Sequence, residues 1–393
     1  MANPPAVTTD PTDPAYRLVT FTHRDEECDG VLALLHTVTD KDRHAGDLTP
    51  HLMERQDDGL WSITYRLRAD HRASYQLHPF RGEAPGTARP DWLHVLDHAR
   101  PDPYDTEPRL PAPDGRHPSS VLSLPDAPAQ PYVRRREGVP RGRTVAHTVA
   151  GRRVDVHLPA GHGDGPQAGD GPHPVAVLLD GDMWGDVLSV GDTLDNLAAD
   201  GAVPPTVALL VHTMGPGRPD DLSCNPAFVD LLADRLLPWA AREFGATTDP
   251  AATVIAGQSA GGLTAAYAAY RRPERFGNAL SQSGSFWWPD TTEFDEGSEW
   301  LTRQFAAEER RTARFYVEVG LQEWMLLAQN RHLRDVLTAR GYDLAYREFN
   351  GGHDYACWRG GLADGLTHLL GPAGSPERGK QGEASRRPGD RTA

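Results

Sequence analysis

A serine flanked by glycines is the residue of this chain whose surroundings most clearly suggest chemistry. It lies in Gly257-Gln258-Ser259-Ala260-Gly261-Gly262, between the apolar residues 252–256 and the Ala-rich residues 263–270. This order predicts a strand, a sharp turn that presents the serine, and a helix, with small residues where strand and helix approach closely. Chance alone supplies such a spacing in roughly one chain in seven of this length, so the partners of Ser259 must carry the interpretation.

Two loops downstream of the serine offer a base and an acid. A serine hydroxyl needs a base to remove its proton, and the base needs a third group that orients it and stabilises its cation. In this arrangement the acid and then the histidine follow the serine, each after a strand. Glu323 follows the expected strand 314–320, and His353 lies behind two glycines after the last expected strand. We therefore predict Ser259 as nucleophile, His353 as general base and Glu323 as acid.

Two other carboxylates are alternatives to Glu323. Glu318 falls in the middle of the expected strand, where its side chain is either buried or turned outward. Asp354 adjoins His353 and is too close in sequence to wrap round onto the far imidazole nitrogen. We favour Glu323 over both, and over the alternative that Glu323 is an ordinary solvated carboxylate.

The oxyanion of the tetrahedral intermediate needs two N–H donors. One is expected from Ala260, the residue after the nucleophile, and the other from the loop after an early strand. That loop is residues 179–184, and we assign the second donor to the N–H of Asp182. An ordinary surface turn is the alternative for this loop.

Apolar strands alternate with amphipathic helices over residues 142–371. The expected strands are 144–149, 153–158, 174–180, 207–212, 252–256, 278–282, 314–320 and 344–349, and the expected helices are 228–244, 262–270, 325–340 and 358–370. The alternation predicts an α/β domain with a mostly parallel sheet covered on both faces. The Gly-rich residues 161–171 superficially resemble a phosphate-binding loop, but a strand rather than a helix follows them, which favours a flexible insertion.

The first part of the chain has a different pattern. Short strand-like runs separated by polar breaks predict a small antiparallel β-sandwich over residues 16–110, with strands at 17–22, 31–38, 49–55, 60–67 and 73–78. Residues 111–141 are rich in Pro, Asp and Arg and predict a connector, and residues 372–393 predict a disordered tail.

Composition restricts the partners. The net charge of -15 over 393 residues argues against general affinity for nucleic acid. The three cysteines lack the spacings of metal or redox motifs, so we expect no metal site and no cofactor, and we expect Cys224 and Cys357 to be unpaired thiols rather than a disulfide. No signal peptide or membrane-spanning run is recognisable, which predicts a cytoplasmic protein without a membrane partner. The sequence predicts no particular oligomeric state.

Several strings of residues together resemble one family. They are 178–184, 222–225, the serine turn 257–262, Leu280-Ser281-Gln282-Ser283-Gly284-Ser285-Phe286-Trp287-Trp288-Pro289 and Gly351-Gly352-His353-Asp354-Tyr355-Ala356-Cys357-Trp358-Arg359-Gly360-Gly361-Leu362. The chain is similar to the enterochelin (enterobactin) esterase family, a relative of the esterase D branch of the α/β-hydrolases. The resemblance covers residues 140–370 well and residues 16–131 less closely, where the family has an N-terminal sandwich domain and a linking segment.

The resemblance implies a function. It implies a serine esterase that hydrolyses the ester bonds of a tri-catecholate siderophore lactone, or of its iron complex, inside the cell so that iron is released. By the same resemblance Ser259, His353 and Glu323 take the roles given above.

It also implies a substrate site. An anionic iron complex calls for a basic group, for which we take Arg218, and its catechol rings call for flat surfaces, for which we take Trp184, Trp287 and Trp288. Core packing for each tryptophan, and a merely solvated charge for Arg218, are the alternatives. The chain departs from the family in the 161–171 insertion and at Asp220, which stands at a position usually basic in the family.

Two other functions stay open at this stage. One is an esterase or acyltransferase of the same fold that acts on sugar or acyl esters. The other is a binding protein whose N-terminal sandwich holds a glycan or siderophore and whose hydrolase site is idle. The complete order of serine, acid and histidine argues against the second.

Overall fold

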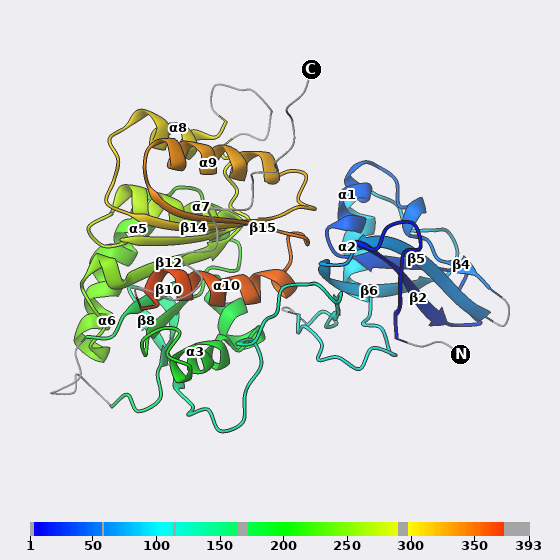
Figure 1. The fold of residues 1–393 in the computed structure, drawn as a ribbon, viewed down its shortest axis with the longest axis horizontal. Helices are drawn as coiled ribbons and strands as arrows, with labels where there is room; N and C mark the ends of the chain where they lie inside the picture. Colours follow the sequence, from blue (N-terminus) through cyan, green and yellow to red (C-terminus); the bar gives the residue numbers. More distant parts are fainter. Residues whose placement is uncertain (1–3, 57–58, 113–114, 164–171, 290–297, 373–393) are drawn as a thin grey trace, which may run out of the picture.

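The chain folds into two parts that face each other across the last helix (Figure 1). A computed structural model describes residues 4–56, 59–112, 115–163, 172–289 and 298–372. The N-terminal part is built from antiparallel strands, and the C-terminal part from a large sheet with helices on both faces. The expected tail from residue 372 lies almost wholly outside the described residues, as does most of the expected 161–171 insertion.

The C-terminal sheet has eight strands in the order β15-β14-β13-β12-β10-β11-β9-β8. Their bounds are β8 (Arg143–Val149), β9 (Arg152–Leu158), β10 (Val175–Leu179), β11 (Val207–Val211), β12 (Thr253–Gln258), β13 (Asn278–Gln282), β14 (Arg314–Gly320) and β15 (Asp343–Phe349). Strands β10 to β15 pair in parallel, while β9 pairs antiparallel with β11 and with β8. The four strands β10 to β13 are buried throughout, because helices cover both faces. The prediction of a mostly parallel, two-sided sheet is confirmed.

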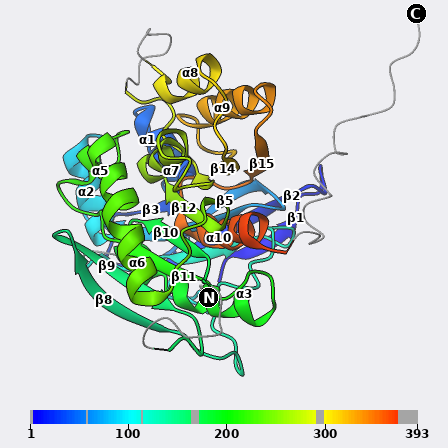
Figure 2. The ribbon, with the colours of Figure 1, turned by 90° about the vertical axis from the view of Figure 1, so that its left-hand side faces the viewer.

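Two layers of helices enclose this sheet (Figures 1 and 2). Their bounds are α3 (Val190–Ala199), α4 (Arg218–Asp221), α5 (Pro226–Leu231), α6 (Leu237–Phe244), α7 (Ala260–Arg271), α8 (Trp300–Ala307), α9 (Leu327–Ala339) and α10 (Tyr355–Leu370). Helices α3 and α10 pack on one face, and α5 to α9 on the other. A π-helical turn, Leu232–Leu236, joins α5 to α6, so the predicted helix 228–244 is one nearly continuous helical segment. Helices α3, α4 and α8 were not predicted.

The N-terminal part is a two-sheet sandwich. One sheet has the order β1-β2-β5-β4 and the other β3-β6-β7. The strands are β1 (Ala6–Thr9), β2 (Tyr16–Arg24), β3 (Gly30–Leu35), β4 (Glu54–Arg55), β5 (Leu60–Arg68), β6 (Arg72–Phe80) and β7 (Ser120–Ser123). Side chains of both sheets, among them Phe21, Trp61 and Tyr75, form one core, which confirms the predicted antiparallel sandwich. Helices α1 (Val38–His44) and α2 (Arg89–His98) accompany the second sheet, and Val95 of α2 packs against Leu32 of β3.

Three details of this part differ from the prediction. The strand expected at 31–38 ends at Leu35, and α1 follows it. The strand expected at 49–55 is a single helical turn, Thr49–His51, and then the two-residue β4. Strand β7 lies within the segment expected to be a connector, so the sandwich extends beyond residue 110. Four residues in a Pro-rich segment give no periodic signal, and their pairing with β6 is a contact between distant residues.

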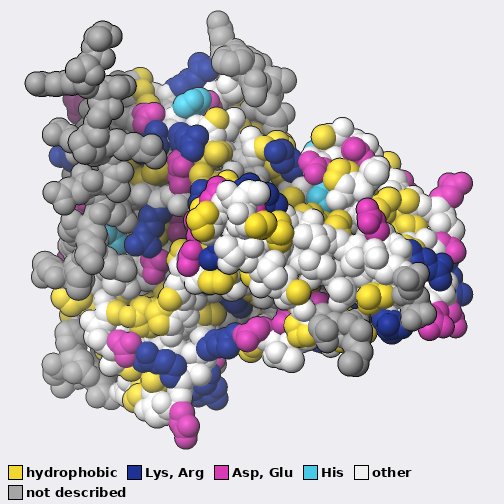
Figure 3. Space-filling model, turned by 45° about the vertical axis from the view of Figure 1, so that its right-hand side comes forward, with side chains coloured by type: hydrophobic (Ala, Val, Ile, Leu, Met, Phe, Trp, Pro, Cys, Tyr) yellow, Lys and Arg dark blue, Asp and Glu magenta, His cyan; other side chains and the backbone are white. Residues whose placement is uncertain are grey.

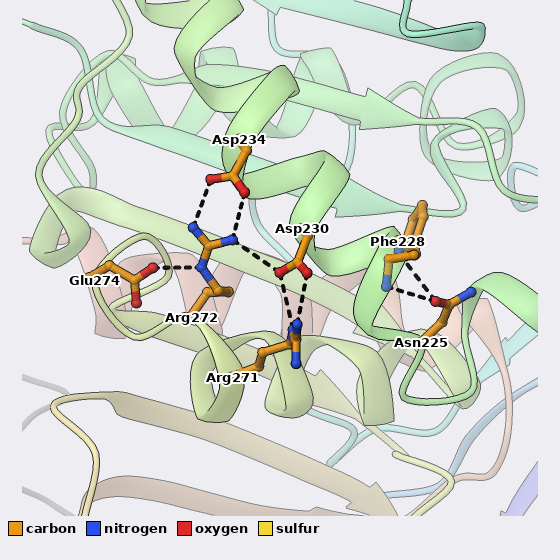
Figure 4. Close-up of polar contacts among 8 residues, drawn as sticks. Asn225, Phe228, Asp230, Asp234, Arg271, Arg272 and Glu274 are labelled. Atoms are coloured by element: carbon orange, nitrogen blue, oxygen red, sulfur yellow. Dashed lines mark hydrogen bonds and ion pairs between the residues drawn. The ribbon is translucent and has the colours of Figure 1, made fainter.

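Ion pairs fasten the helix that follows the serine turn to its neighbour (Figure 4). Arg271 and Arg272, at the end of α7, pair with Asp230 of α5 at 2.8 Å and with Asp234 at 2.7 Å. Asn225 caps the start of α5 by accepting hydrogen bonds from two backbone N–H groups. The end of α7 away from Ser259 is thereby fixed to the helix layer.

The surface mixes charges of both signs. On the face drawn in Figure 3, Lys and Arg side chains are interspersed with Asp and Glu rather than gathered in one basic patch. Within the part of the chain that the structure describes, no helix is both long enough and apolar enough to cross a membrane.

Candidate active site

Ser259 sits in a strained turn between β12 and α7. Its backbone has φ 57° and ψ -120°, a conformation that residues with a side chain rarely adopt and that costs free energy. A Cβ atom on Gly257 would lie 2.4 Å from the backbone of Gly261, so only glycine lets strand and helix meet here. The Ser259 N–H donates to the carbonyl of Gln282 at 3.0 Å, which ties the turn to β13. The sequence thus presents a serine at the carboxyl edge of the sheet.

Glu323 and His353 meet at the same edge. The imidazole Nδ1 of His353 donates to Glu323 Oε2 at 2.6 Å, and Glu323 is 2% exposed. The other oxygen, Oε1, accepts from Ser283 Oγ at 2.5 Å and from the N–H of Gly320 at 2.8 Å. Because the carboxylate holds the proton on Nδ1, Nε2 is left unprotonated and able to accept a proton.

The two alternative carboxylates serve other purposes. Glu318 accepts from Gln282 Nε2 at 2.6 Å and from the Tyr316 hydroxyl at 3.1 Å, and burial raises the pKa of Glu318 to about 7. Asp354 caps α10 by accepting from the N–H of Ala356 at 2.8 Å. Of the three carboxylates, Glu323 is the one that the structure places on the His353 ring.

A cavity of about 400 Å³ opens over Ser259 and His353, between the two parts of the molecule. Its lining includes the aromatic side chains of Trp92, Trp287 and Trp324, the first from the N-terminal sandwich. A second hollow of about 450 Å³ shares Ser259 and His353 and is also lined by Met183, Arg116, His117 and Arg218. Inside the first cavity the Ser259 hydroxyl lies 3.2 Å from Ser285 Oγ. The predicted nucleophile and base therefore face common space.

The predicted tryptophans differ in their surroundings. Trp287 lines the first cavity. Trp184 is 1% exposed and packs in the core, with its Nε1–H donating to Gln258 Oε1 at 3.1 Å, so the expectation that it offers a face to a ligand is wrong. It is buried because the chain enters a π-helical turn, Met183–Val187, that turns its ring into the sheet–α10 core. Trp288 packs edge-on against Trp300 at 5.8 Å and is absent from the described lining of both hollows.

Arg218 lines the second hollow, but its charge already has a partner. Its Nε and Nη2 bind the two oxygens of Asp180 at 2.8 and 2.6 Å, and Asp180 is fully buried. A buried carboxylate left alone would be costly, so this pair stabilises the loop after β10. Only Nη1 of the guanidinium lies outside the pair.

The expected oxyanion donors lie at the starts of two helical segments. Ala260 is the first residue of α7, where an N–H has no carbonyl within the helix to bind. Asp182 immediately precedes the turn Met183–Val187, and burial raises the pKa of its carboxyl. From this loop it is the next residue, Met183, whose side chain lines the second hollow. The N–H of Asp182 stays a prediction.

Several residues at the site were missed from the sequence. Ser283, with φ 50°, holds Glu323 and also accepts from Trp358 Nε1 at 3.0 Å. Trp92, His36 and Thr37 reach the cavity from the sandwich. The string around Ser283 had been singled out, so its hydroxyls were within reach of sequence reasoning, whereas nothing in the sequence relates the sandwich residues to Ser259.

The cysteines are as predicted. Cys28, Cys224 and Cys357 are buried, and each is a free thiol. Burial raises the pKa of Cys224 and of Cys357, so both are kept as neutral thiols.

Comparison with known proteins agrees with this geometry. Two family models match the chain: "Putative esterase" over residues 148–369, and "Enterochelin esterase, N-terminal" over residues 18–133. The iron(III) enterobactin esterase of Escherichia coli K12 is 32% identical over 381 residues, which cover 90% of this chain and 91% of that protein. The enzyme of the same name from Dickeya dadantii is 30% identical over 396 residues, covering 90% and 87%.

Solved structures agree over nearly the whole chain. The ferric enterobactin esterase of Salmonella typhimurium superposes with a TM-score of 0.79 at 30% identity, covering 93% of this chain and 96% of that one. The enterobactin esterase of Shigella flexneri, crystallised in the presence of enterobactin, gives a TM-score of 0.77 at 29% identity with the same coverage. The matches span both parts of the molecule, and this chain belongs to the enterochelin esterase family of carboxylic ester hydrolases.

Proposed function

We propose that this protein is a serine esterase that hydrolyses the ester bonds of a catecholate siderophore lactone of the ferric enterobactin type, inside the cell, to release iron. The observation that carries the proposal is the cavity over Ser259 and His353, whose tryptophans come from both parts of the molecule. Flat apolar rings suit catechol groups, and relatives with the same two-part architecture are named for this activity.

In the proposed mechanism, Ser259 Oγ attacks the ester carbonyl while His353 Nε2 takes its proton. Glu323 fixes the imidazole by accepting from Nδ1 and stabilises the imidazolium that forms. The oxyanion is held by N–H groups, for which we propose Ala260 and Asp182. His353 then gives the proton to the departing alcohol oxygen, which leaves an acyl group on Ser259. A water molecule, deprotonated by His353, attacks this acyl group; the acid product leaves, and His353 returns the proton to Ser259 Oγ.

The charge of the ligand and the charge of the protein have the same sign. The protein carries -15, and a ferric tri-catecholate is anionic, so binding needs local cations. Arg116 and Arg218 line the second hollow, which continues from the same serine and histidine. We propose Arg218 as an anion-binding residue through the part of its guanidinium that Asp180 does not hold, with Trp287 as a catechol-binding surface.

The test is hydrolysis of ferric and iron-free tri-catecholate lactones, with the products separated by mass. The wild-type protein is expected to give linear trimers, dimers or monomers, and Ser259→Ala to give none while keeping the fold. Arylesters and acetylated sugars serve as competing substrates in the same assay. Turnover of those esters with no siderophore products would move the assignment to a general esterase, and siderophore hydrolysis by Ser259→Ala would remove the serine from the mechanism.

A further inference from the structure

The loop that carries His353 is held by the N-terminal sandwich rather than by its own domain alone. The His353 N–H donates to Thr37 Oγ1 at 2.8 Å, and the His353 carbonyl accepts from His36 Nε2 at 2.8 Å. Both backbone groups of the predicted base are thus bound by two successive residues that lie more than 300 positions earlier in the chain. These residues also line the cavity over Ser259.

Thr37 has an unusual backbone for its residue type. It has φ 69°, in the left-handed region that a β-branched side chain strongly disfavours, and it is 3% exposed. Such strain persists only where the surroundings impose it, and it is found where function requires a particular placement.

The hydroxyl of Thr37 does not cap the helix that follows it. Thr37 stands at the N-cap of α1, where a threonine oxygen ordinarily accepts from the first N–H groups of its own helix. Here the side chain makes no such bond and accepts from His353 instead. The sandwich therefore forgoes a helix cap and bears a strained residue at a point where it touches the predicted base.

The facing surface of the loop is shaped to receive this residue. A Cβ atom on Gly352 would lie 2.0 Å from Thr37 Oγ1, so only glycine allows the approach. Next along the loop, Asp354 Oδ2 accepts from the N–H of Ser74 in β6 at 2.5 Å. Contacts on both sides of His353 thus come from the sandwich.

We propose that Thr37 is a positioning residue for His353, so that the N-terminal sandwich completes the catalytic centre instead of only binding substrate. The proposal rests on the assignment of His353 as the base in the proposed function. Thr37 acts through the backbone of His353: it sets where the imidazole stands between Glu323 and Ser259. Its loss affects the chemical step more than the binding of substrate.

The test compares Thr37→Val, which keeps the shape but not the acceptor, with Thr37→Ser, which keeps the acceptor. Since small displacements of a catalytic group are costly, Thr37→Val is expected to lower kcat by about 10–100-fold with KM changed by less than about threefold. Thr37→Ser is expected to restore most of kcat. Ser120→Ala is the matched control, because Ser120 Oγ accepts a buried backbone N–H, that of Asp102 at 3.1 Å, within the sandwich alone.

Each variant is assayed on p-nitrophenyl acetate and on a ferric tri-catecholate lactone. A fall in kcat for Thr37→Val on the aryl ester supports the positioning role even when the siderophore is not a substrate, in which case only the proposed substrate fails. Wild-type kcat for Thr37→Val on both substrates, or an equal fall for Ser120→Ala, overturns the positioning role and leaves the proposed function standing. If Thr37→Val is not recovered folded, Gly352→Ala disrupts the same contact from the other side. An unchanged kcat in Gly352→Ala would also overturn the positioning role.

Discussion

Ser259 and His353, the proposed nucleophile and base, line the same cavity but are held by different parts of the chain. Ser259 is fixed by its immediate surroundings: Gly257 lets strand and helix touch, and Gln282 of the next strand accepts the Ser259 N–H. His353 is fixed by Thr37 and His36, which reach it from the sandwich. The nucleophile is therefore a property of one strand–turn–helix unit, and the base a property of the interface between two folded parts.

Among the substitutions that follow, loss of the proposed acid should have the largest effect, because Glu323 binds the His353 ring directly. Glu323→Gln keeps the shape but places an amide against His353 Nδ1, which favours the wrong tautomer and leaves the imidazolium unsupported. Loss of the equivalent carboxylate in serine hydrolases lowers kcat by about 10⁴-fold, and we expect a fall of about 10²–10⁴-fold here. Steady-state kinetics with an aryl ester, beside a thermal melt, measure it. A decrease in kcat of less than about tenfold would mean that another group orients His353.

A substitution in the serine turn tests whether Ser259 is held by its immediate surroundings. Gly257→Ala places a Cβ 2.4 Å from the Gly261 backbone, inside a buried turn that cannot yield without moving α7. Overpacking of this kind costs about 1–3 kcal/mol or more, and we expect a lower melting temperature together with loss of activity. Gly277→Ala is a comparison outside the turn, because its Cβ would also meet backbone, at 2.3 Å from the carbonyl oxygen of Pro250. If Gly277→Ala loses as much stability as Gly257→Ala but keeps its activity, the loss of activity in Gly257→Ala comes from the serine turn itself.

One pH effect should come from a single buried carboxyl group of the C-terminal domain. The pKa of Glu318 is about 7 in the folded protein and ordinarily 4.5, because burial disfavours its charge. Between these pH values the folded chain keeps a proton that the unfolded chain has lost, so the free energy of unfolding falls as pH rises from 4.5 to 7. The full difference corresponds to about 3 kcal/mol.

Glu318→Gln should remove this fall. Relative to wild type, the variant is expected to gain stability mainly between pH 5 and pH 7 and to level off by pH 8, as measured by denaturant unfolding. Glu318 contacts Gln282 and Tyr316 rather than the sandwich, so kcat at a fixed pH should change little. An equal pH dependence in both proteins would contradict the assignment of the proton to Glu318.

Among the contacts between the two parts, the smallest effect on kcat is expected from the contact between Asp354 and Ser74, which joins the two parts but does not bind the backbone or ring of His353. Asp354→Asn keeps one oxygen that can cap α10 but places its amide NH2 against the Ser74 N–H, which then loses its acceptor. A buried donor left without its partner costs about 1–3 kcal/mol. Thermal unfolding should therefore shift modestly and kcat should fall less than in Thr37→Val. A larger fall in kcat than in Thr37→Val would move the main anchor from Thr37 to Asp354.

The sequence predicted the features that are fixed by neighbouring residues better than those fixed by contacts between the two parts. The strands 278–282 and 314–320 were predicted to the residue, and the chain order of serine, acid and histidine placed Glu323 and His353 at strand ends that the structure brings together. These signals are short-range: periodicity, glycine spacing and the position of a polar residue after an apolar run. The family resemblance agreed with an N-terminal sandwich domain but gave none of its contacts.

The rest depended on contacts between distant residues. Trp184 carries the same signal in sequence as Trp287, and only the π-helical turn that buries it tells them apart. Thr37 fell within the expected strand 31–38, and its position before α1 and its bond to His353 depend on how the two parts fold and dock. Strand β7 was missed for the same reason, because its partner β6 lies 40 or more residues earlier.

The position of the cavity between the two parts has a thermodynamic consequence. A ligand that contacts Trp92 on one side and Trp287 on the other binds only while the parts are docked, and docking is also what seats the loop of His353. By linkage, such a ligand and the competent arrangement of the base stabilise each other to the same extent. A large substrate that spans the cavity thus favours the state that cleaves it, whereas fragments that touch one side exert no such bias and are free to leave.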